Sequence, residues 1–238
     1  AAESPSKHPA IEIGDGKYSD GALFDQIHYL ECKLILKPDR FAVAKGFQDY
    51  AGLVREVAAR NGVTLDGSSA AGARPSMREV AFLDTEDFRL YNNAFILRRR
   101  MSYADYFPVG DPEIVFKFRH PDVQSAAALD VRPGFAGNYR IKFKVEALPL
   151  KDQIGGYRML FSHNAQFGHS QLPEGEQTSM TYLARLFPAL ETLKTSPDEK
   201  VELVNQTFVE ELLQELGVLD FGQTADGADC SAAKASSE

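Results

Sequence analysis

The segment from Asn138 to Leu148 alternates apolar and charged side chains over its whole length. Its apolar members are Tyr139, Ile141, Phe143, Val145 and Ala147, and the residues between them are Arg140, Lys142, Lys144 and Glu146. Successive side chains of a strand point to opposite faces, so this pattern predicts a strand with one apolar and one charged face. Three bases in succession on one face, followed by a carboxylate, indicate a face that holds anions.

The same alternation predicts further strands at 28–36, 79–85, 94–102 and 113–120. Turn-like links separate most of these segments, which favours a mainly antiparallel sheet. In the first strand, Leu30, Cys32, Leu34 and Leu36 are expected on the apolar side. Segment 155–167 fits a helix and a strand equally well.

Apolar residues at helical spacing predict helices over 38–61, 177–193 and 197–216. Asp39 is the expected N-cap of the first helix, and Asn61-Gly62 is its expected end. Pro188 is expected to kink the second helix. Residues 207–209 of the third fit an extended conformation as well.

The remaining segments set the domain limits. Residues 1–27 are expected to form an irregular lead-in, residues 66–75 a Gly/Ser/Ala loop, and residues 223–238 a polar tail. One domain is therefore expected over 28–222.

Charged positions of the same parity occur on four predicted strands. They comprise eight bases, namely Lys33, Arg98, Arg100, Lys117, Arg119, Arg140, Lys142 and Lys144. The carboxylates of Glu31, Glu113 and Glu146 accompany them. An open sheet would leave this face as a solvated basic wall. A closed barrel would instead place the charges in a bore that holds one small ligand, and a phosphate chain suits such donors best.

Composition limits the classes of function. The net charge is −8, from 26 basic and 34 acidic residues, and this argues against a general nucleic-acid-binding protein. No apolar run reaches the roughly 18 residues of a membrane span. Cys32 and Cys230 form no disulfide framework, and His163 and His169, without further ligands nearby, are expected at the surface or in turns. We expect a cytoplasmic protein, or an exported one if the absent initial Met reflects signal cleavage.

Several short motifs resemble those of the CYTH domain, or triphosphate tunnel metalloenzyme, superfamily. Glu31-Cys32-Lys33 resembles the end of its E-x-E-x-K signature, with Tyr29 in place of the first glutamate. Asp84-Thr85, Leu90-Tyr91 and Leu97 to Arg100 are similar to its D-T…L…L-R-x-R block. Lys117, Lys142, Lys144 and Glu146 occupy the places of its later charged positions. The resemblance covers roughly Tyr29 to Leu148.

The resemblance implies a fold and a chemistry. The fold would be an α+β, mainly β, closed antiparallel barrel of eight strands that encloses a triphosphate tunnel, with helices packed outside. The eight bases would grip phosphate oxygens, and Glu31 and Glu146 would hold Mg²⁺ or Mn²⁺. Glu31 and Lys33 would be the catalytic pair as water attacks a terminal phosphoryl group. Because tyrosine is neutral near pH 7, Tyr29 cannot replace the missing carboxylate.

The sequence is therefore compatible with three functions. The first is binding of a triphosphate or polyphosphate, with metal-dependent hydrolysis. The second is a non-catalytic polyanion-binding module that has lost its metal site, and the third is a structural domain with a solvated basic sheet. No general nucleic-acid binding and no membrane association are expected, and the sequence leaves the oligomeric state open.

Overall fold

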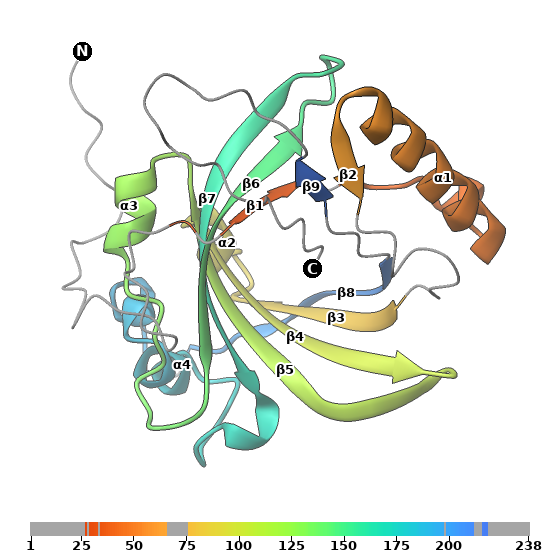
Figure 1. Cartoon of the computed structure of the whole chain (residues 1–238). Coiled ribbons are helices and arrows are strands. Elements are labelled where there is room, and N and C mark those ends of the chain that lie inside the picture. The colour runs from red at the N-terminus through yellow and green to blue at the C-terminus, as the bar shows by residue number, and fades with distance from the viewer. Residues whose placement is uncertain are drawn as a thin grey trace. The chain divides into compact units, whose positions relative to one another are not determined.

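The structure is a computed structural model that describes residues 27, 29–32, 34–65, 76–197, 199–211 and 216–218 (Figure 1). The chain forms two compact units. Among the described residues, the first contains 77–144 and 160–209. The second contains 29–76, 145–159 and the segment after Val209. The predicted 66–75 loop and the 223–238 tail lie outside the described residues, as does the lead-in before Ile27.

The first unit is mainly β. Its strands are β3 (Ser76–Asp84), β4 (Phe95–Ala104), β5 (Phe107–His120), β6 (Arg140–Pro149), β7 (Tyr157–Gly168) and β8 (Glu202–Glu211). Strands β6, β7 and β8 run on into the second unit, to which the first residue of β3 also belongs. Its helices are α2 (Arg89–Asn92), α3 (Val123–Ala128) and α4 (Met180–Leu186), with 3-10 turns η2 (His169–Gln171) and η3 (Pro188–Leu193). Segment 155–167 is thus largely a strand.

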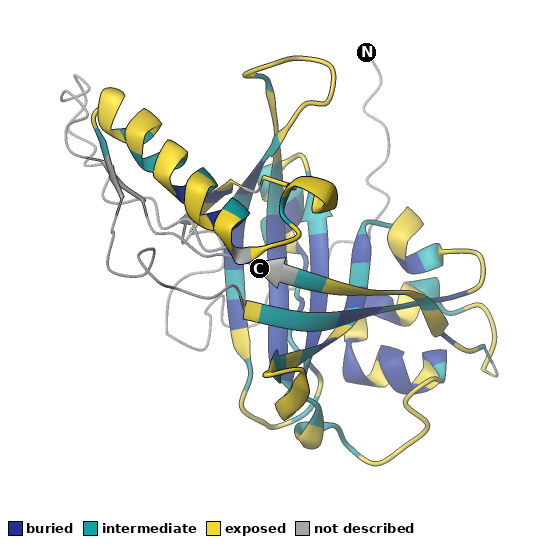
Figure 2. Cartoon of the chain, turned by 90° about the vertical axis from the view of Figure 1, so that its right-hand side faces the viewer, coloured by how far each residue is buried: buried dark blue, intermediate teal, exposed yellow. Residues whose placement is uncertain are grey.

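The second unit holds the shorter elements. They are β1 (Tyr29–Cys32), η1 (Pro38–Arg40), α1 (Ala44–Arg60), β2 (Val63–Leu65) and β9 (Leu216–Val218). Strand β2 pairs with β9 in an antiparallel two-stranded sheet. Helix α1 buries Phe47 and Ala51 and is exposed over much of its remaining surface (Figure 2). It ends as predicted, with Asn61 as C-cap and Gly62 at φ 70°.

The main sheet has seven strands in the order β1-β6-β7-β5-β4-β3-β8 and is not closed into a barrel. The predicted eight-stranded closed barrel is therefore wrong, although a mainly β chain with helices is present. Alternation assigns side chains to faces but does not determine whether the first and last strands pair. A sheet closes into a barrel only when its first and last strands pair, and the tilt and stagger of the strands must suit their number. In the described residues β1 and β8 end the strand order, while β2 and β9 pair with each other in a separate sheet.

The apolar face of the first unit's sheet carries the core. Phe116 stacks on Phe95 at 5.4 Å between ring centroids and on Phe187 at 4.2 Å. Ala126 of α3 and Leu183 of α4 belong to the same buried cluster, and Figure 1 shows both helices on this side of the strands. The predicted apolar faces of β4, β5 and β6 are confirmed, since Phe95, Leu97, Phe116, Phe118, Ile141 and Phe143 all lie in this core.

The helical predictions are confirmed in part. Segment 177–193 contains α4 and η3. The Ser179 side chain caps α4 by accepting a hydrogen bond from the backbone N–H of Tyr182, and η3 begins at Pro188. Proline lacks the N–H that would continue the α-helix, so the chain changes to a 3-10 turn there. Asp39 is not the N-cap of α1, because this helix begins at Ala44 after Val43.

Two other predictions are wrong. The helix over 197–216 is largely strand β8, rich in the β-branched and aromatic residues that favour strands. In the second unit, Leu30, Cys32 and Leu34 are exposed, so they do not form the buried apolar side that was expected, whereas Glu31 of the charged face is buried. The cause is that burial depends on what packs against a face, which alternation alone does not specify.

Candidate functional site

The first unit gathers the predicted bases on the sheet face opposite the apolar core. Ile96, Arg98 and Arg100 of β4 stand opposite Lys117, Val115 and Glu113 of β5. Val115, Lys117 and Arg119 stand in turn opposite Gln166, Asn164 and Ser162 of β7. On β6 the bases alternate with the core residues Ile141 and Phe143. We call this the basic face, defined by Arg98, Arg100, Lys117, Arg119, Arg140, Lys142 and Lys144.

Three cations of the basic face are almost completely buried. Arg100 is 4% exposed, Lys117 2% and Lys144 1%. Arg140, at the start of β6, has a side chain that is 66% exposed. Burial of a charge is costly unless hydrogen bonds or opposite charges surround it. The face therefore needs a polar, electron-rich lining.

Strand β7 supplies a neutral polar stripe between two basic strands. It lies between β6 and β5 in the sheet, and its Ser162, Asn164 and Gln166 are buried. Ser162 Oγ donates to Asn164 Oδ1 at 3.0 Å, and Arg140 Nη2 donates to Gln166 Oε1 at 3.4 Å. Sequence reasoning missed these three residues. Their alternation with Phe161, His163, Ala165 and Phe167 was the available signal for both the strand and its polar face.

The carboxylate of Glu113 contacts two bases of this face. Its Oε2 accepts a hydrogen bond from Arg100 Nη2, and its Oε1 accepts one from Arg140 Nη2 at 3.2 Å. The Glu113 side chain is 28% exposed. A carboxylate has about four lone-pair positions, so further hydrogen-bond donors can still approach it.

A hollow of about 470 Å³ lies beside Glu113 at the end of the paired strands. Its lining consists of Glu113, Gly137, Asn138, Tyr139, Arg140, Gln166, Phe167 and Gly168. Glu113 and Gly168 form the last pair between β5 and β7. The backbone N–H of Asn138 donates to Gln171 Oε1 at 2.8 Å, which fixes the segment before β6. The hollow thus adjoins the exposed end of the basic face.

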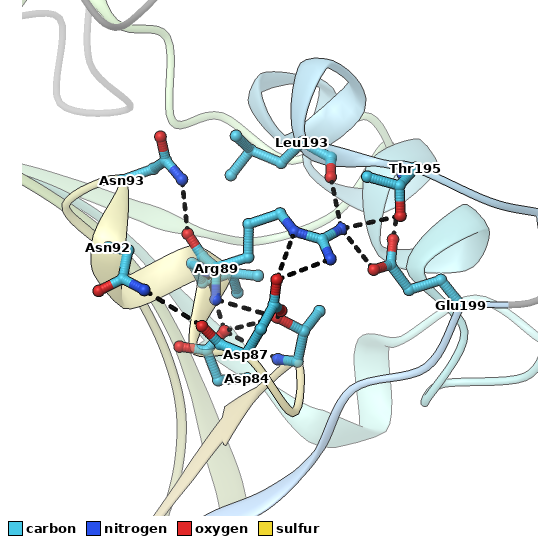
Figure 3. A network of polar contacts seen from close by, with 10 residues as sticks. Asp84, Asp87, Arg89, Asn92, Asn93, Leu193, Thr195 and Glu199 are labelled. Atoms are coloured by element: carbon cyan, nitrogen blue, oxygen red, sulfur yellow. Dashed lines mark hydrogen bonds and ion pairs between the residues drawn. The ribbon is translucent and has the colours of Figure 1, made fainter.

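The Asp84 to Arg89 segment forms a separate polar network (Figure 3). Asp84 is buried and accepts hydrogen bonds from the backbone N–H groups of Thr85 (2.8 Å), Leu90 (2.9 Å) and Tyr91 (2.9 Å). Arg89 contacts Asp87 and Glu199 and donates to Leu193 O at 3.1 Å. The Arg89 contacts connect the turn after β3 to the segment before β8. The hydrogen bonds to Asp84 hold the turn itself, so Asp84 has a local structural role.

The predicted metal ligands lie in the second unit. Glu31 on β1 and Glu146 on β6 are each 1% exposed. Lys33 and the Tyr29 side chain lie outside the described residues. Across the described part of the chain, no group of three or more His, Cys, Asp or Glu side chains is arranged to hold a metal ion. Hard divalent cations take several oxygen ligands. Among the described residues, Glu31 and Glu146 alone do not make such a set.

His163 is not at the surface. It is 1% exposed on the apolar face of β7, with Nδ1 3.2 Å from Ala126 O and its ring 5.3 Å from that of Phe143. It joins β7 to α3, so the expectation of a surface or turn position is wrong for this histidine.

Comparison with known proteins gives no match to this chain among family models, curated proteins or solved structures. The similarity to the CYTH superfamily therefore remains a resemblance of short motifs. None of the described helices combines the length and the apolar character that crossing a membrane requires.

Proposed function

We propose that the first unit binds an oligophosphate, a triphosphate or a polyphosphate, on its basic face. The observation that carries the proposal is the placement of seven bases on one sheet face, three of them almost fully buried. These bases lie together in a chain whose net charge is −8. Guanidinium and ammonium donors match the closely spaced oxygens of phosphate chains.

The arrangement favours a linear anion over a single phosphate. Arg98 and Arg100 lie on β4, Lys117 and Arg119 on β5, and the β6 bases lie beyond β7. Neighbouring strands are about 4.8 Å apart, so the bases extend over several phosphate positions. A chain of phosphates can contact more than one strand at once, which a single phosphate cannot.

Binding is proposed without a catalytic step. Hydrolysis with Mg²⁺ or Mn²⁺ stays a prediction, because it depends on Glu31, Glu146 and Lys33, which are not part of the described basic face. Phosphate release by the purified chain, with and without Mn²⁺, separates a hydrolase from a non-catalytic polyanion-binding module.

A titration with inorganic tripolyphosphate tests the proposal. At about 100 times its Kd the ligand should stabilise the protein by about 2.7 kcal/mol. For a chain of this size that corresponds to a rise in Tm of about 5–10 °C. The rise should shrink as salt concentration increases, because salt screens charge attraction.

Two neighbouring arginines provide a matched pair of variants. Arg98 lies on the basic face, whereas Arg99 is exposed and stands opposite the core residue Ile114. Arg98→Gln and Arg99→Gln remove the same charge from adjacent positions of β4. We expect weaker tripolyphosphate binding in Arg98→Gln and near wild-type binding in Arg99→Gln. Equal losses in both variants would show a nonspecific charge effect, and no binding by the wild type would leave only the structural role.

A further inference from the structure

Strand β8 forms one edge of the main sheet. It comes last in the strand order, and β3 is its neighbour among the described residues (Figure 1). An edge strand presents one row of backbone N–H and C=O groups to which a further strand can add. Natural proteins often protect such an edge with lysine, proline or a very short strand. Strand β8 has 10 residues and contains neither lysine nor proline, so nothing in its own sequence prevents strand addition.

The side chains of β8 are exposed on both faces of the sheet. Leu203 is 55% exposed and Phe208 is 59% exposed, and their different parity assigns them to opposite faces. Gln206 contacts Glu79 of β3, and the ring centroid of Phe208 lies 5.6 Å from that of Tyr103 of β4. A strand added to β8 would therefore cover apolar surface on both faces while it pairs with the backbone.

A second hollow, of about 560 Å³, lies at the start of β8. Its lining consists of Thr85, Glu86, Asp87, Arg89, Glu199, Lys200 and Glu202. Both bases of this lining already have acidic partners. Arg89 contacts Asp87 and Glu199 (Figure 3). Lys200 Nζ lies 2.8 Å from Glu176 Oε1.

The remaining carboxylates give this hollow a negative charge. Glu86 and Glu202 are exposed and form no ion pair with another described residue. A cationic side chain that enters the hollow would therefore meet carboxylates that are not already neutralised. Glu202 is also the first residue of β8, so the acidic hollow and the open strand edge adjoin each other.

We propose that β8 binds an extended peptide segment of another protein, which adds to the sheet as a strand and places a lysine or arginine in the acidic hollow. Glu202 and Phe208 have the same parity and therefore share a face of β8. The bound segment accordingly carries its basic residue beside Glu202 and an apolar residue beside Phe208. In this mode of recognition, backbone hydrogen bonds give affinity and side chains at alternate positions give specificity.

Charge argues against a second copy of this chain as the occupant. Strand β8 contains no lysine or arginine, so a second β8 would bring no base to the hollow. Parallel pairing in register would also place Glu202 beside its own counterpart, and like charges in that position are destabilising. None of the residues of this site belongs to the basic face, so the inference does not rest on the proposed phosphate binding.

Fluorescence polarisation with labelled synthetic peptides tests the proposal. The peptides SKTVTVTVS and SVTVTVTKS alternate polar and apolar residues and carry the lysine at opposite ends, one for each strand direction. At least one should bind below about 1 mM. Its counterpart with glutamate in place of lysine should bind about tenfold more weakly, because attraction becomes repulsion. Proline at the middle position removes a backbone N–H and should abolish binding.

Three outcomes of the peptide experiment would overturn the proposal. They are failure of both lysine peptides to bind at about 1 mM, equal binding of the glutamate counterparts, and undiminished binding of the proline peptide. Sedimentation of the protein alone tests the other occupant. A dimer that is lost in Leu203→Lys would show that a second copy occupies the edge, and this too would overturn the proposal.

Glu202→Lys reverses the charge at the start of β8. We expect this variant to bind the lysine peptide about tenfold more weakly and to prefer the glutamate peptide. Asp152→Lys is the matched control, because Asp152 is exposed and lines neither hollow. Its affinities should stay near those of the wild type. Glu86→Lys repeats the test if Glu202→Lys fails to fold. Equal losses in the control and the test variant would show nonspecific charge attraction and overturn the proposal.

Discussion

Arg100 and Glu113 stand opposite each other on β4 and β5, and Arg100 Nη2 donates a hydrogen bond to Glu113 Oε2. The other carboxylate oxygen accepts from Arg140, which begins β6. One carboxylate thus contacts bases from two strands that are not neighbours in the sheet. It offsets part of their repulsion and fixes the end of the basic face where the hollow begins.

Glu113→Gln removes this shared negative charge. We expect the free energy of unfolding to fall by about 1.5–3 kcal/mol, the range for hydrogen bonds to charged groups. Tripolyphosphate should bind more tightly, because the face gains one net positive charge. Urea denaturation and calorimetry measure the two effects. Glu174→Gln, the same change at an exposed loop position, should alter neither quantity. A Glu113→Gln variant with wild-type stability and affinity would show that the ion pairs contribute nothing.

The β4–β5 hairpin turn is strained. Asp105 and Tyr106 both have positive φ values, 47° and 70°, as a two-residue type I′ turn requires. The left-handed region costs a residue with a Cβ roughly 1–2 kcal/mol, and glycine avoids this cost. Tyr106→Gly should therefore raise the free energy of unfolding by about 1 kcal/mol. Denaturant titration measures it.

The hairpin provides its own control. Ala104→Gly places glycine one residue before the turn, at the end of β4, where it should lower stability by about 0.5–1 kcal/mol. A stabilising Ala104→Gly or a destabilising Tyr106→Gly would contradict the assigned turn.

Asp87 makes stability depend on pH. A hydrogen bond from Thr85 Oγ1 at 2.6 Å, and then those from Arg89, lower the pKa of Asp87 below its ordinary value of 3.8. The carboxylate therefore stabilises the folded state above the unfolded pKa. That contribution is lost as the pH falls through the lower folded pKa. Asp87→Asn should be less stable than the wild type at pH 7, and the difference should vanish as the pH falls well below 3.8.

Melting temperatures from pH 7 to pH 2 test this dependence. Glu86→Gln is the control, because Glu86 is the exposed neighbour of Asp87. A difference between wild type and Asp87→Asn that stays constant over this range would contradict the role of the carboxylate charge.

Sequence alternation predicted the faces of β4, β5 and β6 correctly. Phe95, Phe116 and Phe143 lie in the core, and their basic neighbours lie on the other face. The reason is geometric: side chains of a strand change face at every residue, so a strict pattern leaves one consistent assignment. Ser162, Asn164 and Gln166 follow the same rule, but the small and amide side chains of 155–167 gave too little contrast to identify a strand.

Strand β8 shows a limit of local pattern. Residues 197–216 fitted a helix in the sequence, yet residues 202–211 form a strand at the edge of the sheet next to β3. More than a hundred residues separate β3 from β8, so the pairing is not visible in the local sequence. Tertiary context overrides a weak local preference in such segments.

The sequence by itself determined which residues share a sheet face, because side-chain parity is a local property of an extended chain. It also determined the end of α1 at Asn61-Gly62 and an irregularity at Pro188, where backbone chemistry is decisive. Only the tertiary structure decided that β7 lies between β5 and β6, that the sheet stays open, and that Glu113 meets both Arg100 and Arg140. These features depend on pairing between distant segments, whose free energy comes from burial and hydrogen bonds that no short stretch contains.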